Sequence, residues 1–263
     1  MNKKLFKKKT NGEKLVNGRF AYLTDIGKVR LTNEDQARAS INSQGVVLLV
    51  VCDGMGGQNK GDYASNIALN TIMDAFNSKA RFFFRWEVGL WLNNIIRKAN
   101  SAINDEANKN PKYQGMGTTL SVAIIFKDIL FTAQIGDSRI YALRDNQLVQ
   151  LTDDQTYVGY LYRTGQITKE EMKTHPRRHM LMNALGVYPS INIDLKFQPY
   201  NGETLLVCSD GLYNNVSEST LCSILRGDDS PEQKINELIA MGNSNGGSDN
   251  MGIVIWESNS YGN

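Results

Sequence analysis

The sequence predicts an α+β protein in which amphipathic helices pack on mainly antiparallel β-sheets. Six apolar runs rich in β-branched residues indicate strands, two-residue turns follow two of these runs, and apolar residues between 62 and 108 recur at helical spacing. With 263 residues, of which 41% are hydrophobic and 21% charged, the chain is long enough to bury a substantial core, and one domain is expected.

The expected strands are the six apolar runs at 46–51, 118–126, 129–135, 139–143, 204–208 and 251–256. Lys127-Asp128 separates two of these runs, and Asp145-Asn146 ends another; both dipeptides suit tight hairpin turns. Hairpins join antiparallel strands, so the sheet is predicted to be largely antiparallel.

Four helical segments are expected. Apolar residues keep helical spacing in two of them, over Ala64–Phe76 and over Val88–Ile103. Thr168 followed by Glu171 forms a capping-box pattern before a third helix, and Ser230 followed by Pro231 marks the start of a fourth. The apolar stripes of these helices need a partner, and the sheets provide it.

The charge is unevenly distributed along the chain. The formal net charge is +2, but residues 1–14 hold six lysines and one glutamate, so the remainder is acidic. A basic arm of this kind suits nucleic acid or an anionic membrane, but the segment lacks interleaved aromatic residues and is interpreted as a solvated tail. No apolar run approaches the roughly 20 residues of a membrane span. The three cysteines, an odd number, suit a reducing compartment, so a cytoplasmic protein is expected.

The aromatic run RFFFRW at residues 81–86 allows two interpretations. Aromatic side chains beside arginine stack on nucleic-acid bases. Three consecutive phenylalanines at a helix junction more often fill a core between helix and sheet. The second interpretation is adopted, so these residues are predicted to be buried.

Aspartates adjoin apolar strands at four places. Asp53, Asp137 and Asp210 follow such runs, and Asp249 precedes one. Strand ends share the edges of a sandwich, so these carboxylates could converge on one cleft, where they would repel one another unless a polyvalent cation neutralised them. Hard oxygen ligands without a Cys/His cluster favour Mg²⁺ or Mn²⁺ over zinc. Each aspartate taken alone could equally cap a turn.

Two neighbouring features support a metal site that handles phosphate. Gly54 exposes a backbone carbonyl that can act as a neutral ligand, whereas the glycine spacing after it matches neither common phosphate-binding loop. Arg30 could hold a phosphoryl group with its planar fork, or form a surface salt bridge with Glu34 four residues later.

The order of several motifs resembles the bacterial branch of the metal-dependent serine/threonine protein phosphatases, the PPM or type 2C family. The resemblance covers about residues 19–257 and is carried by DIGKVRLTNED, VVCDGMGG, GMGTTLSVA, IGDSRIYAL, LLVCSDGLYNNV and GGSDNMGIVIW. It implies a four-layer α-β-β-α sandwich with two central sheets flanked by helix pairs. The phosphatase domain would occupy residues 18–258, with a flap at about 153–190 and tails at 1–17 and 259–263.

The resemblance also implies a role for each matching residue. Asp53 would bridge two Mn²⁺ or Mg²⁺ ions, Gly54 would give its carbonyl to one ion, and Asp210 and Asp249 would complete the site. Glu34 and Asp35 would act on the metals through water, Asp137 would help hold a third, weaker metal, and Arg30 would bind the substrate phosphate. Arg30, Asp35 and Asp53 are thus the expected catalytic residues.

The expected reaction is hydrolysis of phosphoserine and phosphothreonine in proteins by a hydroxide that the metal pair generates, without a covalent phosphoenzyme. The partners would be phosphorylated proteins and a cognate bacterial Ser/Thr kinase, and a monomer without nucleic acid is expected. A catalytically weak or silent regulator that binds phosphoproteins in the same cleft is the alternative. The chain departs from the family at Gln58 and Met55, where relatives have histidine, and at Asn214, where some have aspartate.

Overall fold

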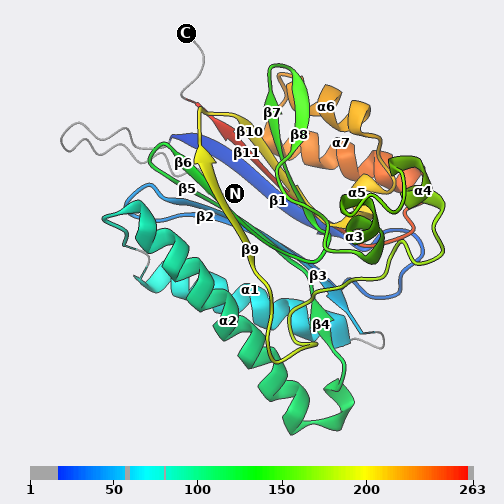
Figure 1. Cartoon of the computed structure of the whole chain (residues 1–263). Helices are drawn as coiled ribbons and strands as arrows, with labels where there is room; N and C mark the ends of the chain where they lie inside the picture. Colours follow the sequence, from blue (N-terminus) through cyan, green and yellow to red (C-terminus); the bar gives the residue numbers. More distant parts are fainter. Residues whose placement is uncertain (1–16, 57–59, 80, 260–263) are drawn as a thin grey trace.

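The protein is a four-layer sandwich in which two antiparallel sheets lie between two pairs of helices (Figure 1). The computed structural model describes residues 17–56, 60–79 and 81–259. The predicted α-β-β-α architecture is therefore confirmed. Most of the predicted N-terminal tail and Gln58 lie outside the described residues.

All strand pairings within the two sheets are antiparallel. The five-stranded sheet has the order β1 (Gly18–Asp25), β11 (Met251–Ser258), β10 (Thr204–Cys208), β7 (Arg139–Arg144) and β8 (Gln147–Gln150). The other sheet has the order β2 (Asp35–Ile41), β3 (Val47–Met55), β5 (Leu120–Phe126), β6 (Ile129–Ile135) and β9 (Asp194–Pro199), with β4 (Gly117–Thr118) paired to β3 beside it. β1, β2 and β9 were not predicted from the sequence, because each is only partly buried and has no continuous apolar run.

Helices cover the outer faces of both sheets. The long helices α1 (Lys60–Lys79) and α2 (Arg85–Lys109) pack on the six-stranded sheet, and α6 (Glu218–Arg226) and α7 (Pro231–Ser244) pack on the five-stranded sheet. Short helices lie in the connections: α3 (Tyr157–Arg163), α4 (Lys169–Thr174), α5 (Asp210–Tyr213) and a 3₁₀ turn (Pro111–Tyr113). Thr168 and Ser230 cap α4 and α7 as predicted, each in a capping box.

The strand period of two distributes side chains among three apolar layers. In β3, Val50 and Cys52 point toward α1 and α2, whereas Val51 points into the layer between the sheets. Trp256 fills that central layer, and Cys208 faces α6 and α7. Cys52 and Cys208 are fully buried and unpaired, as expected of small core residues.

Both predicted hairpin turns are present. Lys127 between β5 and β6, and Asp145 and Asn146 between β7 and β8, have positive φ angles of 58°, 47° and 63°. Positive φ at the central residues gives the backbone twist that antiparallel hairpins need. The β5–β6 turn lies at the opposite end of the sheet from Asp137, because β6 runs its seven residues between them.

The aromatic run at residues 81–86 corrects the sequence prediction. Phe82 is buried at 5% exposure and makes edge contacts with Trp91 and Phe126. Phe83, Phe84 and Trp86 are 69%, 61% and 60% exposed. The prediction of a buried cluster is therefore wrong for two of the three phenylalanines, because residues 81–84 are not helical and only Phe82 turns toward the sheet.

Candidate active site

The predicted acidic residues lie at the termini of strands that point to one end of the sandwich, which we call the acidic end. Asp35 begins β2 and pairs in register with Asp53 near the end of β3. In the facing sheet, Asp210 follows β10 at the start of α5, and Asp249 comes two residues before β11. Asp137 follows β6. Opposed cross-strand residues have Cα atoms about 5 Å apart, so Asp35 and Asp53 are direct neighbours.

Ser209 joins the two sheets at this end. Its buried hydroxyl donates to Oδ2 of Asp35 at 2.6 Å and accepts from the backbone N–H of Gly252 at 2.8 Å. The backbone of Gly211 also packs closely against that of Asn250. A Cβ on Gly211 would lie 1.9 Å from the carbonyl oxygen of Asn250. Glycine is therefore required at residue 211, where α5 contacts the segment that holds Asp249.

The aspartates share one electrostatic environment. Burial raises the pKa of Asp35, Asp53, Asp137 and Asp210, and neighbouring aspartates raise each pKa further. The charges of Asp35, Asp210, Asp137 and Asp249 all act on Asp53. Like charges that are gathered in a low-dielectric site favour protonation or a bound cation. The sequence prediction that the carboxylates converge is supported by this mutual repulsion.

Glu34 adds a further carboxylate beside this group. Burial raises its pKa, and its Oε1 atom is buried without a hydrogen-bond partner among the described residues. The backbone around it is closely packed, because a Cβ on Gly54 would lie 2.2 Å from the carbonyl oxygen of Gly61 and 2.7 Å from that of Glu34. Only glycine fits at residue 54, because the backbones of Glu34 and Gly61 approach it so closely.

Arg30 lies at the acidic end, where it forms an ion pair with Asp249 rather than with Glu34. Its Nη2 atom donates to Oδ2 of Asp249 at 2.7 Å, and its side chain is 49% exposed. The alternative of an i,i+4 surface salt bridge with Glu34 is thus replaced by a contact across 219 residues of sequence. The guanidinium group is exposed enough to meet a ligand that enters from solvent.

The oxygen atoms gathered at the acidic end are suitable ligands for hard divalent cations. Its side chains present carboxylate oxygens, and Gly54 adds a backbone carbonyl, which together are the ligand types of Mg²⁺ and Mn²⁺. The orphaned Oε1 atom of Glu34 is a polar group that still needs a partner. In the part of the chain that the structure describes, no three His, Cys, Asp or Glu side chains already surround one point as metal ligands.

Some supporting residues were not predicted from the sequence. Asn250 accepts from the backbone N–H of Glu34 and donates to the carbonyl oxygens of Ile26 and Thr32, so it holds the segment that carries Arg30. Asn214, which the sequence marked as a departure from the family, donates to Oδ2 of Asp210 at 3.1 Å. Polar residues directly beside the predicted ligands, as in SDG and SDN, were the available signal for Ser209 and Asn250.

Arg139 supports Asp137 from the flap side. It binds Asp154 through Nε and Nη2, with the shortest distance 2.7 Å, and its guanidinium lies 3.6 Å from the ring centroid of Tyr213. The hydroxyl of Tyr213 donates to the backbone carbonyl of Asp137 at 3.0 Å. This chain of contacts fixes the loop after β6 to the first residues of the predicted flap.

The histidines take no part in these contacts. His175 lies against Tyr157, and its Nδ1 atom accepts from the backbone N–H of Arg177. His179 is exposed in the same segment, and among the described residues neither histidine bonds to an acidic side chain. Met55 pairs with Gly117 beside the site.

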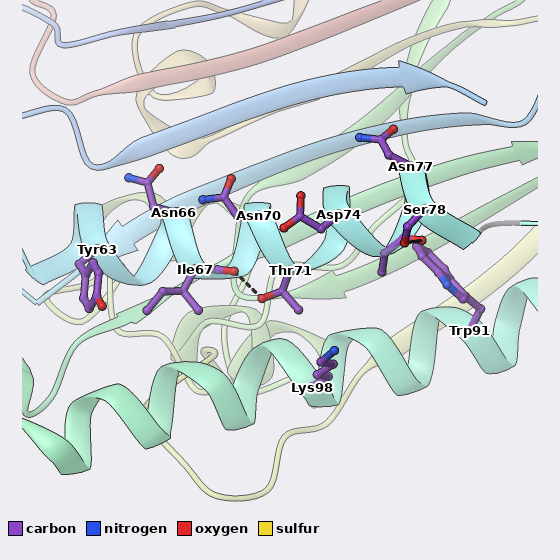
Figure 2. A pocket seen from close by; sticks show the side chains of 11 residues that line it. Tyr63, Asn66, Ile67, Asn70, Thr71, Asp74, Asn77, Ser78, Trp91 and Lys98 are labelled. Carbon is purple, nitrogen blue, oxygen red and sulfur yellow. Dashed lines mark hydrogen bonds between the residues drawn. The ribbon is translucent and has the colours of Figure 1, made fainter. Parts of the chain in front are cut away.

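A separate groove of about 990 Å³ lies between α1 and α2 (Figure 2). Polar side chains of α1, among them Asn66, Asn70 and Asp74, line it together with Trp91 and Lys98 of α2. None of the predicted site residues takes part in it, so this groove is distinct from the acidic end.

The two-sheet sandwich between helix pairs matches the fold of solved PPM phosphatases. The sequence model described as protein phosphatase 2C matches residues 28–242. The chain therefore belongs to the protein phosphatase 2C family, and it is a serine/threonine protein phosphatase.

Individual relatives agree with this assignment. A serine/threonine phosphatase stp of Listeria welshimeri is 38% identical over 239 residues, which are 90% of this chain and 95% of the relative. The serine/threonine phosphatase of S. agalactiae has a TM-score of 0.85 and 31% identity, covering 91% of this chain and 99% of that one. The catalytic domain of the phosphatase PstP in complex with two manganese ions has a TM-score of 0.79 and 32% identity, covering 92% and 98%.

Proposed function

We propose that the acidic end is the active site, and that it hydrolyses phosphoserine and phosphothreonine in proteins with the help of two bound Mn²⁺ or Mg²⁺ ions. The observation that carries this proposal is that strand ends bring Asp35, Asp53, Asp137 and Asp210 together at one end of the sandwich, where each is close enough to another carboxylate for its pKa to be raised. Such a group gains most from divalent cations. The manganese ions in the related PstP structure support the choice of metal.

Each residue then has a role. Asp53 would bridge the two ions, Gly54 would add its carbonyl, and Asp210 and Asp249 would complete the site. Glu34 and Asp35 would act through water, and Asp137 would help hold a third, weaker ion. Bound divalent cations supply positive charge that acidifies water and orients it for in-line attack on phosphorus.

The chain itself would prepare and hold the substrate. Ser209 fixes the Asp35 carboxylate by its 2.6 Å hydrogen bond, so that this oxygen stays in one orientation. Arg30 would exchange its contact with Asp249 for two oxygens of the substrate phosphate, which match its planar fork. Cys52 and Cys208 are fully buried in apolar layers, so neither thiol is placed to attack phosphorus.

We further propose that the protein acts in the cytoplasm as a monomer. It would oppose a Ser/Thr kinase, because its substrates are the products of such a kinase. Among the described residues no helix is both long and apolar enough to cross a membrane.

Thermal unfolding with and without Mn²⁺ tests the metal site independently of activity. Mn²⁺ at about 100 times its dissociation constant should stabilise the wild type by about 2.7 kcal/mol. Asp210→Asn should lose most of this gain, whereas Asp228→Asn, an exposed aspartate between α6 and α7, should keep it. Turnover of a phosphothreonine peptide should stop on chelation. A wild type that Mn²⁺ does not stabilise, with turnover indifferent to chelation, would contradict the proposal.

Kinetics test the role of Arg30 separately. Arg30→Gln should raise the KM for a phosphothreonine peptide by roughly tenfold or more, since a charge-assisted contact with phosphate is worth about 1.5–3 kcal/mol. Arg30→Lys should recover only part of this loss, because lysine lacks the planar fork. An unchanged KM in both variants would remove Arg30 from the phosphate site.

A further inference from the structure

The end of the sandwich opposite the acidic end carries an exposed aromatic patch, which we define as Phe83, Phe84, Trp86, Leu90 and Phe197. All five side chains are more than half exposed. Phe84 and Trp86 stack with their ring centroids 6.3 Å apart, and Leu90 follows Trp86 by one turn of α2. Large apolar side chains scattered singly need no explanation, but a contiguous group marks an interaction surface.

The patch extends over two elements beside the start of α2. Phe83, Phe84 and Trp86 line a groove of about 410 Å³ together with Phe126–Ile129, the turn region of the β5–β6 hairpin. Phe197 lies on β9, the edge strand next to β6, where its ring packs 6.0 Å from that of Phe131. Figure 1 shows the first turn of α2 and the β5–β6 hairpin on the same side of the molecule. The surface therefore joins a helix start, a hairpin turn and a sheet edge.

Basic residues surround the aromatic side chains. Arg81, Arg85 and Lys127 are exposed there. Two acidic residues face the same region: Asp128 in the hairpin turn, and Glu87, whose carboxylate accepts from the backbone N–H groups of Phe83 and Phe84. Glu87 thereby serves the start of α2, and the rim carries three basic side chains against two acidic ones.

The Lys-rich segment joins the fold at the same end. Gly18, the first residue of β1, is packed against the ring of Trp256. Trp256 donates to the Tyr200 hydroxyl at 2.8 Å, and the backbone N–H of Tyr200 donates to the carbonyl of Asp128 at 2.8 Å. The first residue of β1 thus lies at the same end as the hairpin turn that borders the aromatic patch, and the sequence that precedes it holds six lysines and one glutamate in residues 1–14.

We propose that this end of the protein binds the surface of an anionic phospholipid membrane. Aromatic side chains with a basic rim suit the headgroup region, where Trp and Phe enter the apolar boundary and Arg and Lys meet lipid phosphates. A single weak anchor gives only marginal binding, and a basic segment supplies the second signal. The acidic end then faces away from the membrane and stays open to substrate.

The lipid surface is favoured over a second copy of this chain by the charge. A copy would bring its own Arg81, Arg85 and Lys127 against the same residues of the rim, and these would repel one another, whereas anionic headgroups neutralise them.

Vesicle co-sedimentation of the full chain tests the proposal. The wild type should sediment with vesicles of about 30 mol% phosphatidylglycerol in phosphatidylcholine, bind phosphatidylcholine alone at least tenfold more weakly, and be released as salt rises. Phe84→Ser combined with Trp86→Ser should weaken binding by roughly tenfold. Tyr160→Ser combined with Tyr162→Ser, two comparably exposed aromatics on α3, is the matched control and should bind like the wild type.

Glutamine at the six lysines of residues 1–14 should also weaken binding and flatten its salt dependence. Turnover of p-nitrophenyl phosphate by the Phe84/Trp86 variant should match the wild type, which shows that it folds. Equal binding to the two kinds of vesicle, or binding that survives the serine substitutions, overturns the proposal. A wild type that ignores vesicles but shows a mass that rises with concentration by light scattering, lost in the serine variant, would assign the patch to a second copy instead.

Discussion

The two ends of the sandwich are built from the same strands, yet they break the usual distribution of residues in opposite ways. At the acidic end, aspartates that normally seek water lie beside one another: Asp35 and Asp137 are buried, and Asp53 is only partly exposed. At the other end, phenylalanine and tryptophan side chains that normally seek the core are exposed. β6 joins both, with the Lys127–Asp128 turn before it and Asp137 after it.

The residues at both ends of the sandwich lower the stability of the folded protein. A buried group of like charges and an exposed aromatic patch each cost free energy that the three apolar layers must offset. Both ends are held by strands whose side chains pack fully, from Val47 to Cys52 in β3 and from Leu205 to Cys208 in β10. Positions that depart from the burial rule without a packing reason are therefore the positions to test for function.

The largest effect is expected from Asp53→Asn at the acidic end. The substitution removes the carboxylate that interacts with the other aspartates, so turnover should fall by roughly 10³-fold, about 4 kcal/mol in transition-state stabilisation. The apparent melting temperature without metal should stay the same or rise, because repulsion is relieved. Kinetics and calorimetry on one preparation check both. If Asp53→Asn retained turnover, the carboxylates of the acidic end would not be needed for catalysis.

The next effect compares two adjacent phenylalanines. Phe82→Ala should destabilise the protein by about 3–5 kcal/mol, because Phe82 is buried against Trp91 and Phe126. Phe83→Ala should change stability by less than about 0.5 kcal/mol, since this side chain is exposed. Urea unfolding measures both. Equal losses would mean that Phe83 packs in solution and does not belong to the exposed patch.

A smaller effect is expected from Ser209→Ala. The loss leaves the N–H of Gly252 and one oxygen of Asp35 without their buried partner, which should cost about 1–3 kcal/mol in stability. Turnover should also fall by about 10–100-fold, as is common when a hydrogen-bond partner that orients a residue at a metal site is removed. Ser217→Ala, at the N-cap of α6, is a stability control that should leave turnover unchanged. Normal turnover in Ser209→Ala would show that Asp35 needs no fixed orientation.

The smallest effect is expected from Asn214→Ala. Its amide donates one exposed hydrogen bond to Asp210, so turnover should fall only a few-fold, in line with about 0.5–1.5 kcal/mol for such a bond. The Mn²⁺ concentration that gives half-maximal rate is the sensitive measurement. A loss of turnover as large as that of Asp53→Asn would show that Asn214 is essential for activity and contradict this prediction.

Much of this protein follows from its sequence alone. Continuous apolar runs predicted the central strands, the Lys127-Asp128 and Asp145-Asn146 dipeptides predicted the hairpins, and Thr168 and Ser230 predicted helix starts. These signals are local, because turn conformation, capping and strand periodicity depend on residues only a few positions apart. The order of the acidic motifs also predicted the family, which the relatives confirm.

Tertiary structure alone decided the rest. Only the folded chain shows that Arg30 pairs with Asp249, that Ser209 holds Asp35 across 174 residues of sequence, and that Phe82 is buried while Phe83 and Phe84 are exposed. The partly buried strands β1, β2 and β9 also depend on their neighbours for their conformation. The physical reason is that burial and long-range hydrogen bonds are set by what packs against a residue, and no local pattern encodes that partner.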